Sequence, residues 1–251
     1  MSLLETRKLR KYFGFLHAVD DVDFSVRPGE VLALIGSNGA GKTTLVNLIS
    51  GLLRADGGQV LFQGTDVTHL SVVDRIRGGI ARSFQLVNLF DQMTTFDNIA
   101  LSIFSREGKT QKLMSLAGAD RAVRREALEV LSQFGLETKR NVLAGVLSQG
   151  ERKLLDVGVA YALRPKLLFL DEPTSGVSTR EKAPIMDIIS AVVRSEKITA
   201  VIIEHDMDVV FGYSDRIVAM HQGAILAQGT PQEIRRNEQV SMTLIGAPSF
   251  D

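Results

Sequence analysis

The sequence of 251 residues has no cysteine, no excess of charge of either sign and no long apolar run. The absence of cysteine excludes disulfide bonds and thiolate metal sites, and it suits a reducing cytoplasm. The 29 basic residues balance the 29 acidic ones, which argues against a nucleic acid as partner. Apolar runs such as VLALIG and ITAVII are far shorter than the roughly 18 residues that a membrane-spanning helix needs. The first residues lack the apolar core of a signal peptide, so we expect a soluble chain.

The most specific stretch, VLALIGSNGAGKTTLVNLISGLL, occupies residues 31–53. A short apolar run leads into the pattern G-x-x-x-x-G-K-T, and apolar residues at helical spacing follow. Glycines let backbone amides curl around a phosphate, and the start of the helix adds partial positive charge there. Lys42 would bridge the phosphates, and the Thr43 hydroxyl would ligate Mg²⁺. Because strand, loop, lysine and helix occur in order, we favour a phosphate-binding loop over an ordinary glycine-rich turn.

The residues around this loop have the patterns of β-strands. The segment 22–26 alternates, with Val22, Phe24 and Val26 predicted to face inward. Tyr12 and Phe13 are expected in a loop, where one ring could stack on a nucleotide base or could be a core aromatic at a strand end. Further strands are expected at 3–9, 59–63 and 80–84, with a short helix at 72–77 capped by Ser71.

From Gln85 to about residue 164, helical patterns replace strand patterns. Thr95 is expected to cap a helix, residues 122–134 form another that ends at Gly135, and the pentapeptide LSQGE at 147–151 opens a third. The polar segment 106–120 is expected to be mobile. Because this block interrupts a β/α pattern, we predict an inserted helical subdomain at 85–165 within a nucleotide-binding α/β core formed by 1–84 and 166–251.

Two acids follow the apolar run 167–170. Such a run favours a buried parallel strand, which would present Asp171 and Glu172 at the carboxyl edge of the sheet, where ligands bind. Asp171 would hold Mg²⁺ through water, and Glu172 would polarise the attacking water as a general base. A solvated acidic turn is the alternative, and the phosphate-binding loop in the same chain argues against it.

Among the four histidines, only His205 closely follows a buried-strand pattern, at 198–203. Alone it would be an ordinary polar residue at a sheet edge, but beside the other motifs it is a candidate sensor of the γ-phosphate. The remaining patterns predict a helix at 181–193 that tolerates Pro184 only in its first turn, strands at 216–220 and 224–227, and a capping box from Thr230 to Glu233.

The segments GSNGAGKTT, LSQGE, LLFLDEP, SGVS and IIEHD, together with Gln85 at a strand end, occur in the order and spacing of an ATP-binding-cassette ATPase. The resemblance covers nearly the whole chain, and LSQGE resembles the signature motif of that family. Residues 81–99 and 203–210 are most similar to the ATPase subunits of branched-chain amino acid importers. The implied fold is α/β: a P-loop NTPase core with a mixed sheet and helices, an antiparallel β-rich N-terminal part and the inserted helical subdomain.

The resemblance implies a role for each motif. Phe13 would stack on adenine, with Tyr12 as the alternative, and Gln85 would contact Mg²⁺ and the attacking water. The signature would act on the ATP of the opposite subunit, so that two subunits close on ATP and reopen after hydrolysis. The implied residues are Phe13, Gly36, Ser37, Asn38, Gly39, Ala40, Gly41, Lys42, Thr43 and Thr44 for ATP; Lys42, Gln85, Glu172 and His205 for catalysis; Thr43, Gln85 and Asp171 for Mg²⁺; Ser148, Gln149, Gly150 and Glu151 for the signature; and Ser175, Gly176, Val177 and Ser178 for the loop after Asp171, the D-loop.

Two motifs depart from the family pattern. In the signature, which usually reads LSGGQ, Gln149 and Glu151 replace the middle glycine and the last glutamine, and Glu151 adds negative charge close to the γ-phosphate. Ser178 replaces an aspartate that usually links the two nucleotide sites, so coupling across the dimer would be weaker or differently built. Neither departure removes a catalytic group.

The resemblance implies an ATP-hydrolysing subunit of a transporter that imports branched-chain or related amino acids. It would be cytoplasmic and peripheral on the inner face of the membrane, with a second ATPase subunit (the same or a similar chain), integral membrane permease subunits and, indirectly, a solute-binding protein. The alternatives are a soluble ATPase of this family in cluster assembly or repair, and a regulatory module without turnover. The absence of a coiled-coil insertion between Lys42 and Asp171 argues against the repair proteins, and Glu172 with His205 argues against a module without turnover.

Overall fold

The computed structural model describes residues 2–83, 89–108 and 120–245, which form two compact units. One unit comprises the ranges Met1–Arg75 and Thr199–Asp251, and the other comprises Ile76–Ile198. The predicted subdomain, 85–165, falls within the second range, and its boundaries stay a prediction. None of the helices in the described ranges combines the length and the apolar character that crossing a membrane requires.

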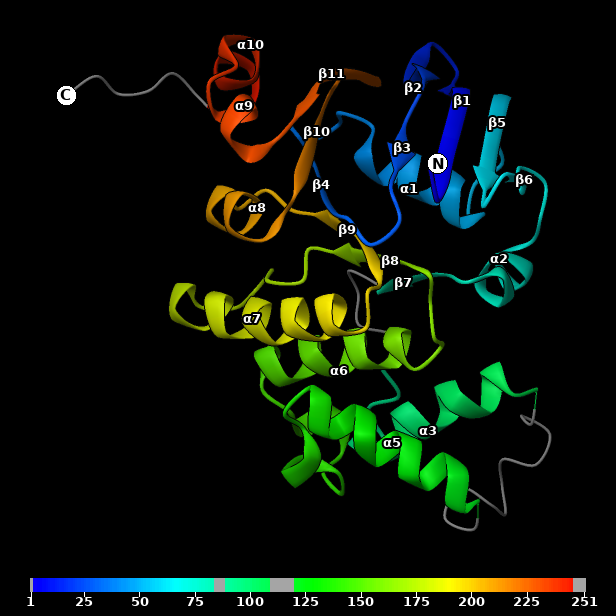
Figure 1. Cartoon of the computed structure of the whole chain (residues 1–251), viewed down its shortest axis with the longest axis vertical. Coiled ribbons are helices and arrows are strands. Elements are labelled where there is room, and N and C mark those ends of the chain that lie inside the picture. The colour runs from blue at the N-terminus through cyan, green and yellow to red at the C-terminus, as the bar shows by residue number, and fades with distance from the viewer. Residues whose placement is uncertain (1, 84–88, 109–119, 246–251) are drawn as a thin grey trace. The chain divides into compact units, whose positions relative to one another are not determined.

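An antiparallel sheet forms the start of the first unit (Figure 1). The predicted inward residues Val22, Phe24 and Val26 are buried, but the expected single strand is divided into two. The Thr6 hydroxyl donates to the Val22 carbonyl and accepts from the Phe24 amide, so a side chain satisfies the backbone at the break. The strand order is β2–β1–β5–β6, with β3 also paired to β1: β1 (Leu4–Phe13), β2 (Leu16–Val22), β3 (Ser25–Val26), β5 (Gly57–Phe62) and β6 (Thr65–Asp66).

The expectation that Tyr12 and Phe13 lie in a loop is wrong. Strand β1 continues through Phe13, and Tyr12 pairs with His17 across the hairpin to β2. The two rings stack with their centroids 4.1 Å apart. Pairing with β2 and this stacking stabilise an extended conformation that a short sequence window does not predict.

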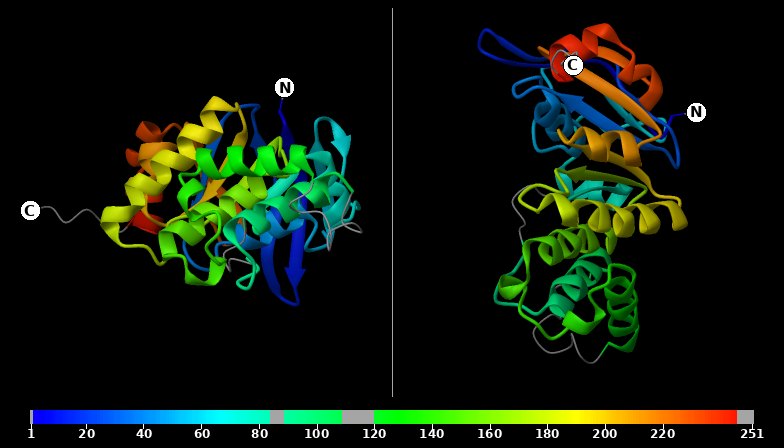
Figure 2. Two further views of the ribbon diagram at one scale, coloured as in Figure 1. Left: turned by 90° about the horizontal axis from the view of Figure 1, so that it is seen from below. Right: turned by 90° about the vertical axis from the view of Figure 1, so that its left-hand side faces the viewer.

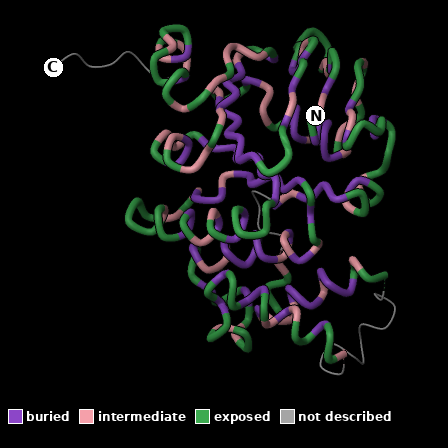
Figure 3. The backbone as a smooth tube through the Cα atoms, viewed as in Figure 1, coloured by how far each residue is buried: buried purple, intermediate pink, exposed green. Residues whose placement is uncertain are grey.

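A mixed sheet forms the rest of the first unit. Its order is β11–β10–β4–β9, in which β10, β4 and β9 are parallel and β11 is antiparallel to β10. Every residue of 31–35 in β4 is buried (Figure 3). On one face, Ala33 and Ile35 pack in a cluster with residues of the C-terminal helices. The elements are β4 (Val31–Gly36), β9 (Thr199–Ile203), β10 (Arg216–His221), β11 (Ala224–Gly229), α8 (Met207–Tyr213), α9 (Pro231–Arg235), α10 (Glu238–Val240) and the last turn, η4 (Ser241–Ile245).

Helix α1 (Lys42–Ser50) follows β4 and contacts both β2 and β4. Arg75 of α2 (Val72–Gly78) hydrogen-bonds to the C-terminal end of α1. The Arg75 residue is only 2% exposed. The Arg75 guanidinium donates to the Leu48 and Ile49 carbonyls, both at 2.6 Å, and to the Thr68 carbonyl at 2.7 Å. The Leu48 and Ile49 carbonyls lie in the last turn of α1, where helical amides run out and Leu48 accepts only a long bond, 3.3 Å, from the Gly51 amide, so the arginine supplies donors to this turn.

Helices dominate the second unit (Figure 2). Helices α3, α5 and α6 pack side by side around buried residues such as Ile103, Val123 and Phe134, and α7 packs along α6. Strands β7 and β8 are parallel neighbours. The elements are β7 (Ile80–Ser83), α3 (Thr95–Arg106), α5 (Arg121–Gln133), η2 (Glu137–Lys139), η3 (Ala144–Val146), α6 (Gln149–Tyr161), β8 (Leu167–Asp171) and α7 (Thr179–Ser195).

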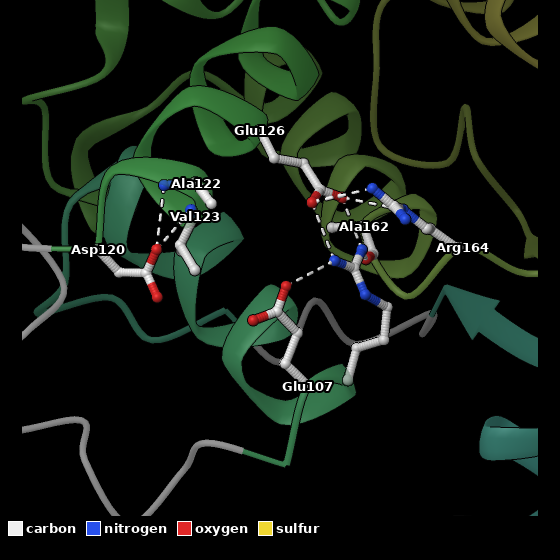
Figure 4. Close-up of polar contacts among 8 residues, drawn as sticks. Glu107, Asp120, Ala122, Val123, Glu126, Ala162 and Arg164 are labelled. Atoms are coloured by element: carbon white, nitrogen blue, oxygen red, sulfur yellow. Dashed lines mark hydrogen bonds and ion pairs between the residues drawn. The ribbon is translucent and has the colours of Figure 1, made fainter.

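An ion-pair network joins three of these segments (Figure 4). Glu126 of α5 accepts from Arg106 of α3 at 2.6 Å and from Arg164, which follows α6, at 3.1 Å. Arg106 also donates to the Ala162 carbonyl at the end of α6, at 2.8 Å. The hydrogen bonds from Arg106 hold the pKa of the Glu126 carboxyl below its ordinary value.

Two helices start at residues other than those the sequence predicts. Thr94, not Thr95, caps α3: its hydroxyl accepts from the Asp97 amide at 3.0 Å, while Thr95 is buried in the first turn. Helix α7 begins at Thr179, so Pro184 lies in its interior, and the expectation that this proline sits in the first turn is wrong. The helix starts earlier because Ser178 is extended and its carbonyl accepts from the amides of the first turn.

Candidate functional site

The glycine-rich loop lies between β4 and α1 in the first unit. Lys42 is the first residue of α1, and its Nζ donates to the Gly36 carbonyl at 2.6 Å and to the Ser37 carbonyl at 3.1 Å. Gly41, the residue before the helix, has no side chain that could cap the first amides of α1. A helix start that is left open beside a lysine is suited to bind the phosphates of a nucleotide.

Two glycines of this loop are required by close approaches of the backbone. A Cβ on Gly41, whose φ is 99°, would lie 2.2 Å from the Ala18 carbonyl oxygen. A Cβ on Gly36 would lie 2.5 Å from the Met220 carbonyl oxygen. Any side chain at either position would collide with main chain, so the loop keeps its shape only with glycine at both.

The mixed sheet brings His205 to the edge at which this loop lies. Strands β4, β9 and β10 are parallel, Leu34 pairs with Ile203, and Gly36 pairs with Met220, so the loop and His205 follow the same carboxyl edge. The His205 side chain is 69% exposed. The backbone amide of His205 donates to the buried carboxylate of Glu204 at 3.1 Å. This bond fixes the main chain just after strand β9.

The two aromatic candidates before the loop have different surroundings. The Tyr12 ring stacks on His17, and its hydroxyl donates to Asp20 at 2.6 Å, which raises the pKa of Tyr12. The Phe13 side chain is 49% exposed, with the Lys11 ammonium 5.5 Å from the ring centroid. Phe13 is therefore not a core aromatic, and its role as the ring that stacks on a base stays a prediction.

The two predicted acids lie at the end of β8 in the second unit. Asp171 is the last residue of that strand and is 5% exposed. It forms an ion pair with Arg82 of the neighbouring strand β7, which is buried to a similar degree. Ser83 pairs with Leu170, so β7 and β8 end at the same edge. Gln85, which follows β7, lies outside the described residues.

Glu172 has an unusual backbone conformation. Its φ is 46°, in the left-handed region that costs a non-glycine residue about 1–3 kcal/mol. Because Pro173 follows, the favoured alternative for Glu172 is extended. Its carbonyl accepts two hydrogen bonds, from the Ser175 amide at 3.1 Å and from Lys153 Nζ at 2.9 Å. The turn after β8 therefore holds Glu172 in a strained conformation, and its catalytic role stays a prediction.

The signature segment forms the start of α6. Ser148 caps the helix by accepting from the Glu151 amide at 3.3 Å, and the Glu151 carboxylate accepts from the Ser148 amide at 2.9 Å. The same carboxylate lies 3.0 Å from Lys139 Nζ. The pKa of Glu151 lies below its ordinary value, mainly because of the hydrogen bond from the Ser148 amide and to a smaller extent because of Lys139. The extra negative charge that the sequence places here is thus paired within the chain.

Gly150 packs against helix α7, and Ser178 is the residue that precedes it. A Cβ on Gly150 would lie 3.0 Å from the terminal methyl of Ile185, so this glycine lets α6 approach α7 closely. Ser178 caps α7 without a side-chain bond to its amides, and its hydroxyl instead donates to the Glu181 carboxylate. The position at which the family usually has an aspartate is therefore engaged with its own helix.

Three basic residues at these motifs were not predicted from the sequence: Arg82, Lys139 and Lys153. Arg82 lies in an apolar strand pattern, where a charge signals a buried acidic partner on a neighbouring strand. Lys153 lies on the buried face of α6, where a cation signals buried acceptors nearby, here a main-chain carbonyl and a serine hydroxyl. Lys139 lies in a polar turn and has no distinguishing pattern.

Comparisons with known proteins agree with these motifs. The family model described as ABC transporter matches residues 19–175. The high-affinity branched-chain amino acid transport ATP-binding protein BraF of Pseudomonas aeruginosa is 36% identical over 250 residues, which cover 97% of this chain and 98% of that protein. A solved ATP-binding cassette of an ABC transporter in its ADP conformation is 32% identical, with a TM-score of 0.85, over 98% of this chain and 99% of the other.

A third relative is cbiO1 of Clostridium perfringens, described as part of the ABC transporter complex cbiONQ. It is 25% identical with a TM-score of 0.81, over 98% of this chain and 97% of the other. The mixed α/β architecture is that of these cassettes, a P-loop NTPase fold. A family match over more than half of the chain and a relative this similar over nearly its full length confirm the resemblance seen in the motifs: the chain belongs to the ABC transporter family, as one of its ATP-binding ATPase subunits.

Proposed function

We propose that this chain powers the import of branched-chain or related amino acids. The observation that carries the proposal is the match to BraF over almost the whole of both chains, because that protein's name assigns it to branched-chain amino acid transport. The segments 81–99 and 203–210, in which the sequence most resembles such importers, support the same substrate class. The matched relatives are transport proteins, which favours this function over a soluble ATPase of assembly or repair.

In this proposal the loop from Gly36 to Thr44 binds the phosphates of ATP. Lys42 is suited to do so because it is the first residue of α1, where its ammonium adds to the positive end of the helix. On binding, Lys42 exchanges the carbonyls of Gly36 and Ser37 for phosphate oxygens. Phe13 stacks on the base, since its ring is exposed while the Tyr12 ring is occupied by His17.

The donor atoms proposed for Mg²⁺ fit that ion. Thr43 in the first turn of α1 is exposed and offers a hydroxyl oxygen, and Asp171 offers a carboxylate. Gln85, the third candidate, lies outside the described residues. Within the described ranges, no group of three or more His, Cys, Asp or Glu residues could hold a metal ion by itself. This suits a cation held partly by phosphates and water, which lowers the charge on the phosphates during transfer.

Glu172 is proposed as the general base and His205 as the group that contacts the γ-phosphate. Glu172 is held in a defined backbone conformation, and His205 presents an exposed ring at the edge where the phosphate loop lies. Ser148 and Gly150 would contact the ATP of a second ATPase subunit, either a copy of this chain or a similar one. Closure on ATP and reopening after hydrolysis would then drive the permease subunits at the inner face of the membrane.

Two variants test the assigned roles. Lys42→Ala should abolish ATP binding, because it removes the cation from the phosphate loop. Glu172→Gln should keep ATP affinity and reduce turnover by about 100-fold or more, the scale of a lost general base. Equilibrium binding of a labelled ATP analogue and steady-state ATPase assays separate the two effects. An equal loss of ATP affinity in both variants would contradict the roles.

The transport function is tested by recovering the tagged chain from native membranes in mild detergent and identifying its partners by mass. Integral membrane subunits should be recovered with it, and a co-purifying solute-binding protein should bind a branched-chain amino acid in a direct titration. The matched control is the same tag on an unrelated protein of similar size. Recovery of soluble partners alone, with ATPase activity intact, would reject the transporter function and leave the nucleotide chemistry standing.

A further inference from the structure

Lys153 carries a buried charge on helix α6, and the roles proposed above do not use it. The residue is 6% exposed, and its ammonium donates to the Glu172 carbonyl at 2.9 Å and to the Ser175 hydroxyl at 2.8 Å. Burying an ammonium costs free energy unless acceptors replace its water, and an apolar residue of similar volume would pack there at lower cost. The hydrogen bonds that Lys153 makes are therefore the reason to have a lysine at this position.

The acceptors of Lys153 lie in the turn that sets the direction of the Glu172 side chain. Glu172 has a left-handed backbone although Pro173 favours an extended one, so something must hold it there. Its carbonyl accepts from the Ser175 amide and from Lys153, which together use both lone pairs of that oxygen. If the carbonyl turned away from these donors, the Cα–Cβ bond of Glu172 would change direction with it.

We propose that Lys153 is a positioning residue for ATP hydrolysis, which holds the main chain of Glu172 so that the carboxylate points at the attacking water. The inference rests on the proposed role of Glu172 as general base. Lys153 lies on the helix that Ser148 caps, so it also joins the signature segment to the catalytic turn of the same subunit. A displacement of α6 by the ATP of the opposite subunit would reach Glu172 through this ammonium.

A double-mutant cycle in the full chain tests the proposal. Lys153→Met should lower kcat by about 10-fold to 100-fold, the cost of a misplaced catalytic group, with little change in ATP affinity. In the Glu172→Gln background the same substitution should have almost no further effect on kcat, because Lys153 acts through the Glu172 carboxylate. Equal losses of kcat in both backgrounds would overturn the proposal, since a merely structural lysine lowers activity wherever it is removed.

Arg152→Met is the matched control on the same helix. Arg152 donates to the Ala144 carbonyl and pairs with Asp91, and it has no bond to the Glu172 turn. Its removal should lower the thermal midpoint without the kcat coupling seen for Lys153. If Lys153→Met does not fold, Lys153→Leu takes its place in the cycle, because it also removes the donor and needs less space. An unchanged kcat in a folded Lys153 variant would reject the positioning role.

The same assays separate this proposal from the proposed function. If the unsubstituted chain does not hydrolyse ATP, or if Glu172→Gln hydrolyses it normally, the role of Glu172 is wrong and the inference about Lys153 is rejected with it. If the unsubstituted chain hydrolyses ATP, Glu172→Gln does not, and Lys153→Met retains full kcat, the role of Glu172 stands and only the role of Lys153 is rejected.

Discussion

Asp171 and Arg82 form a buried ion pair between neighbouring parallel strands. Each is less than a tenth exposed at its side chain, so each depends on the other to compensate the loss of water. Asp171 is also the residue proposed to face Mg²⁺ through water. If the proposed Mg²⁺ role holds, a substitution of Asp171 should lower both the stability of the chain and its ATPase activity.

At the scale of single residues, we predict that Arg82→Met lowers the free energy of unfolding by about 3–5 kcal/mol, because it leaves the Asp171 carboxylate buried without its cation. Denaturation in urea measures the change. The matched control is Arg125→Met, since Arg125 is exposed and its pair with Glu129 is long, 3.8 Å, so that its loss should cost less than about 0.5 kcal/mol. An equal, small effect of both substitutions would show that the buried pair contributes nothing.

At the scale of elements, the helix that begins at the phosphate loop depends on Arg75 at its other end. Arg75→Lys should lower the free energy of unfolding by about 2–3 kcal/mol, because a lysine ammonium cannot reproduce the planar guanidinium that donates to three buried carbonyls. The control is Arg77→Lys on the same helix. Because Arg77 is exposed, this substitution should change the free energy of unfolding by less than about 0.5 kcal/mol. Thermal denaturation compares the two, and a stable Arg75→Lys would contradict this capping role.

The network at Glu126 makes the packing of α3, α5 and α6 sensitive to acid. Hydrogen bonds from Arg106 hold the pKa of Glu126 below its ordinary value of 4.5, with a further contribution from Arg164. A lowered pKa in the folded state means that the unfolded state binds this proton more readily. The stabilisation is therefore complete above the ordinary value and is lost as the pH falls through the lower, folded value.

Glu126→Gln should remove this contribution. The wild type should be more stable than the variant by about 1–3 kcal/mol at neutral pH, and the difference should shrink as the pH falls below about 4.5. Urea denaturation at several pH values measures the difference. Glu129→Gln on the same helix is the control, since that side chain is 65% exposed. A difference that stays constant with pH would contradict the assignment of the lowered pKa to Glu126.

At the scale of the whole molecule, nucleotide binding should stabilise the folded chain. ATP at about 100 times its Kd adds about 2.7 kcal/mol by linkage. For a chain of this size, that corresponds to a rise in Tm of about 5–10 °C. The rise should vanish in Lys42→Ala and decrease when a chelator removes Mg²⁺. A full rise in Lys42→Ala, measured by differential scanning fluorimetry, would contradict the assignment of the phosphate site to this loop.

Much of the fold was predictable because its signals are local. The apolar runs that became β4, β8 and β9, the helix start at LSQGE, the capping box at Thr230 and the glycine at the end of α5 each need only neighbouring residues. The errors occurred where pairing with another segment decides. Pairing across the hairpin extended β1 through Phe13, and a β-bridge to Leu143 holds Thr94 extended, which placed the cap one residue before the expected threonine.

The sequence alone determined the chemistry that this chain can perform, because the phosphate loop, the two acids and the signature are short motifs whose residue types and order carry their meaning. Only the tertiary structure decided what holds those groups in place. Arg82 and Asp171 lie 89 residues apart in the chain, and Lys153 reaches the Glu172 carbonyl from a different element. A buried charge is tolerated only where folding brings its partner to it, and no local pattern states which partner that is.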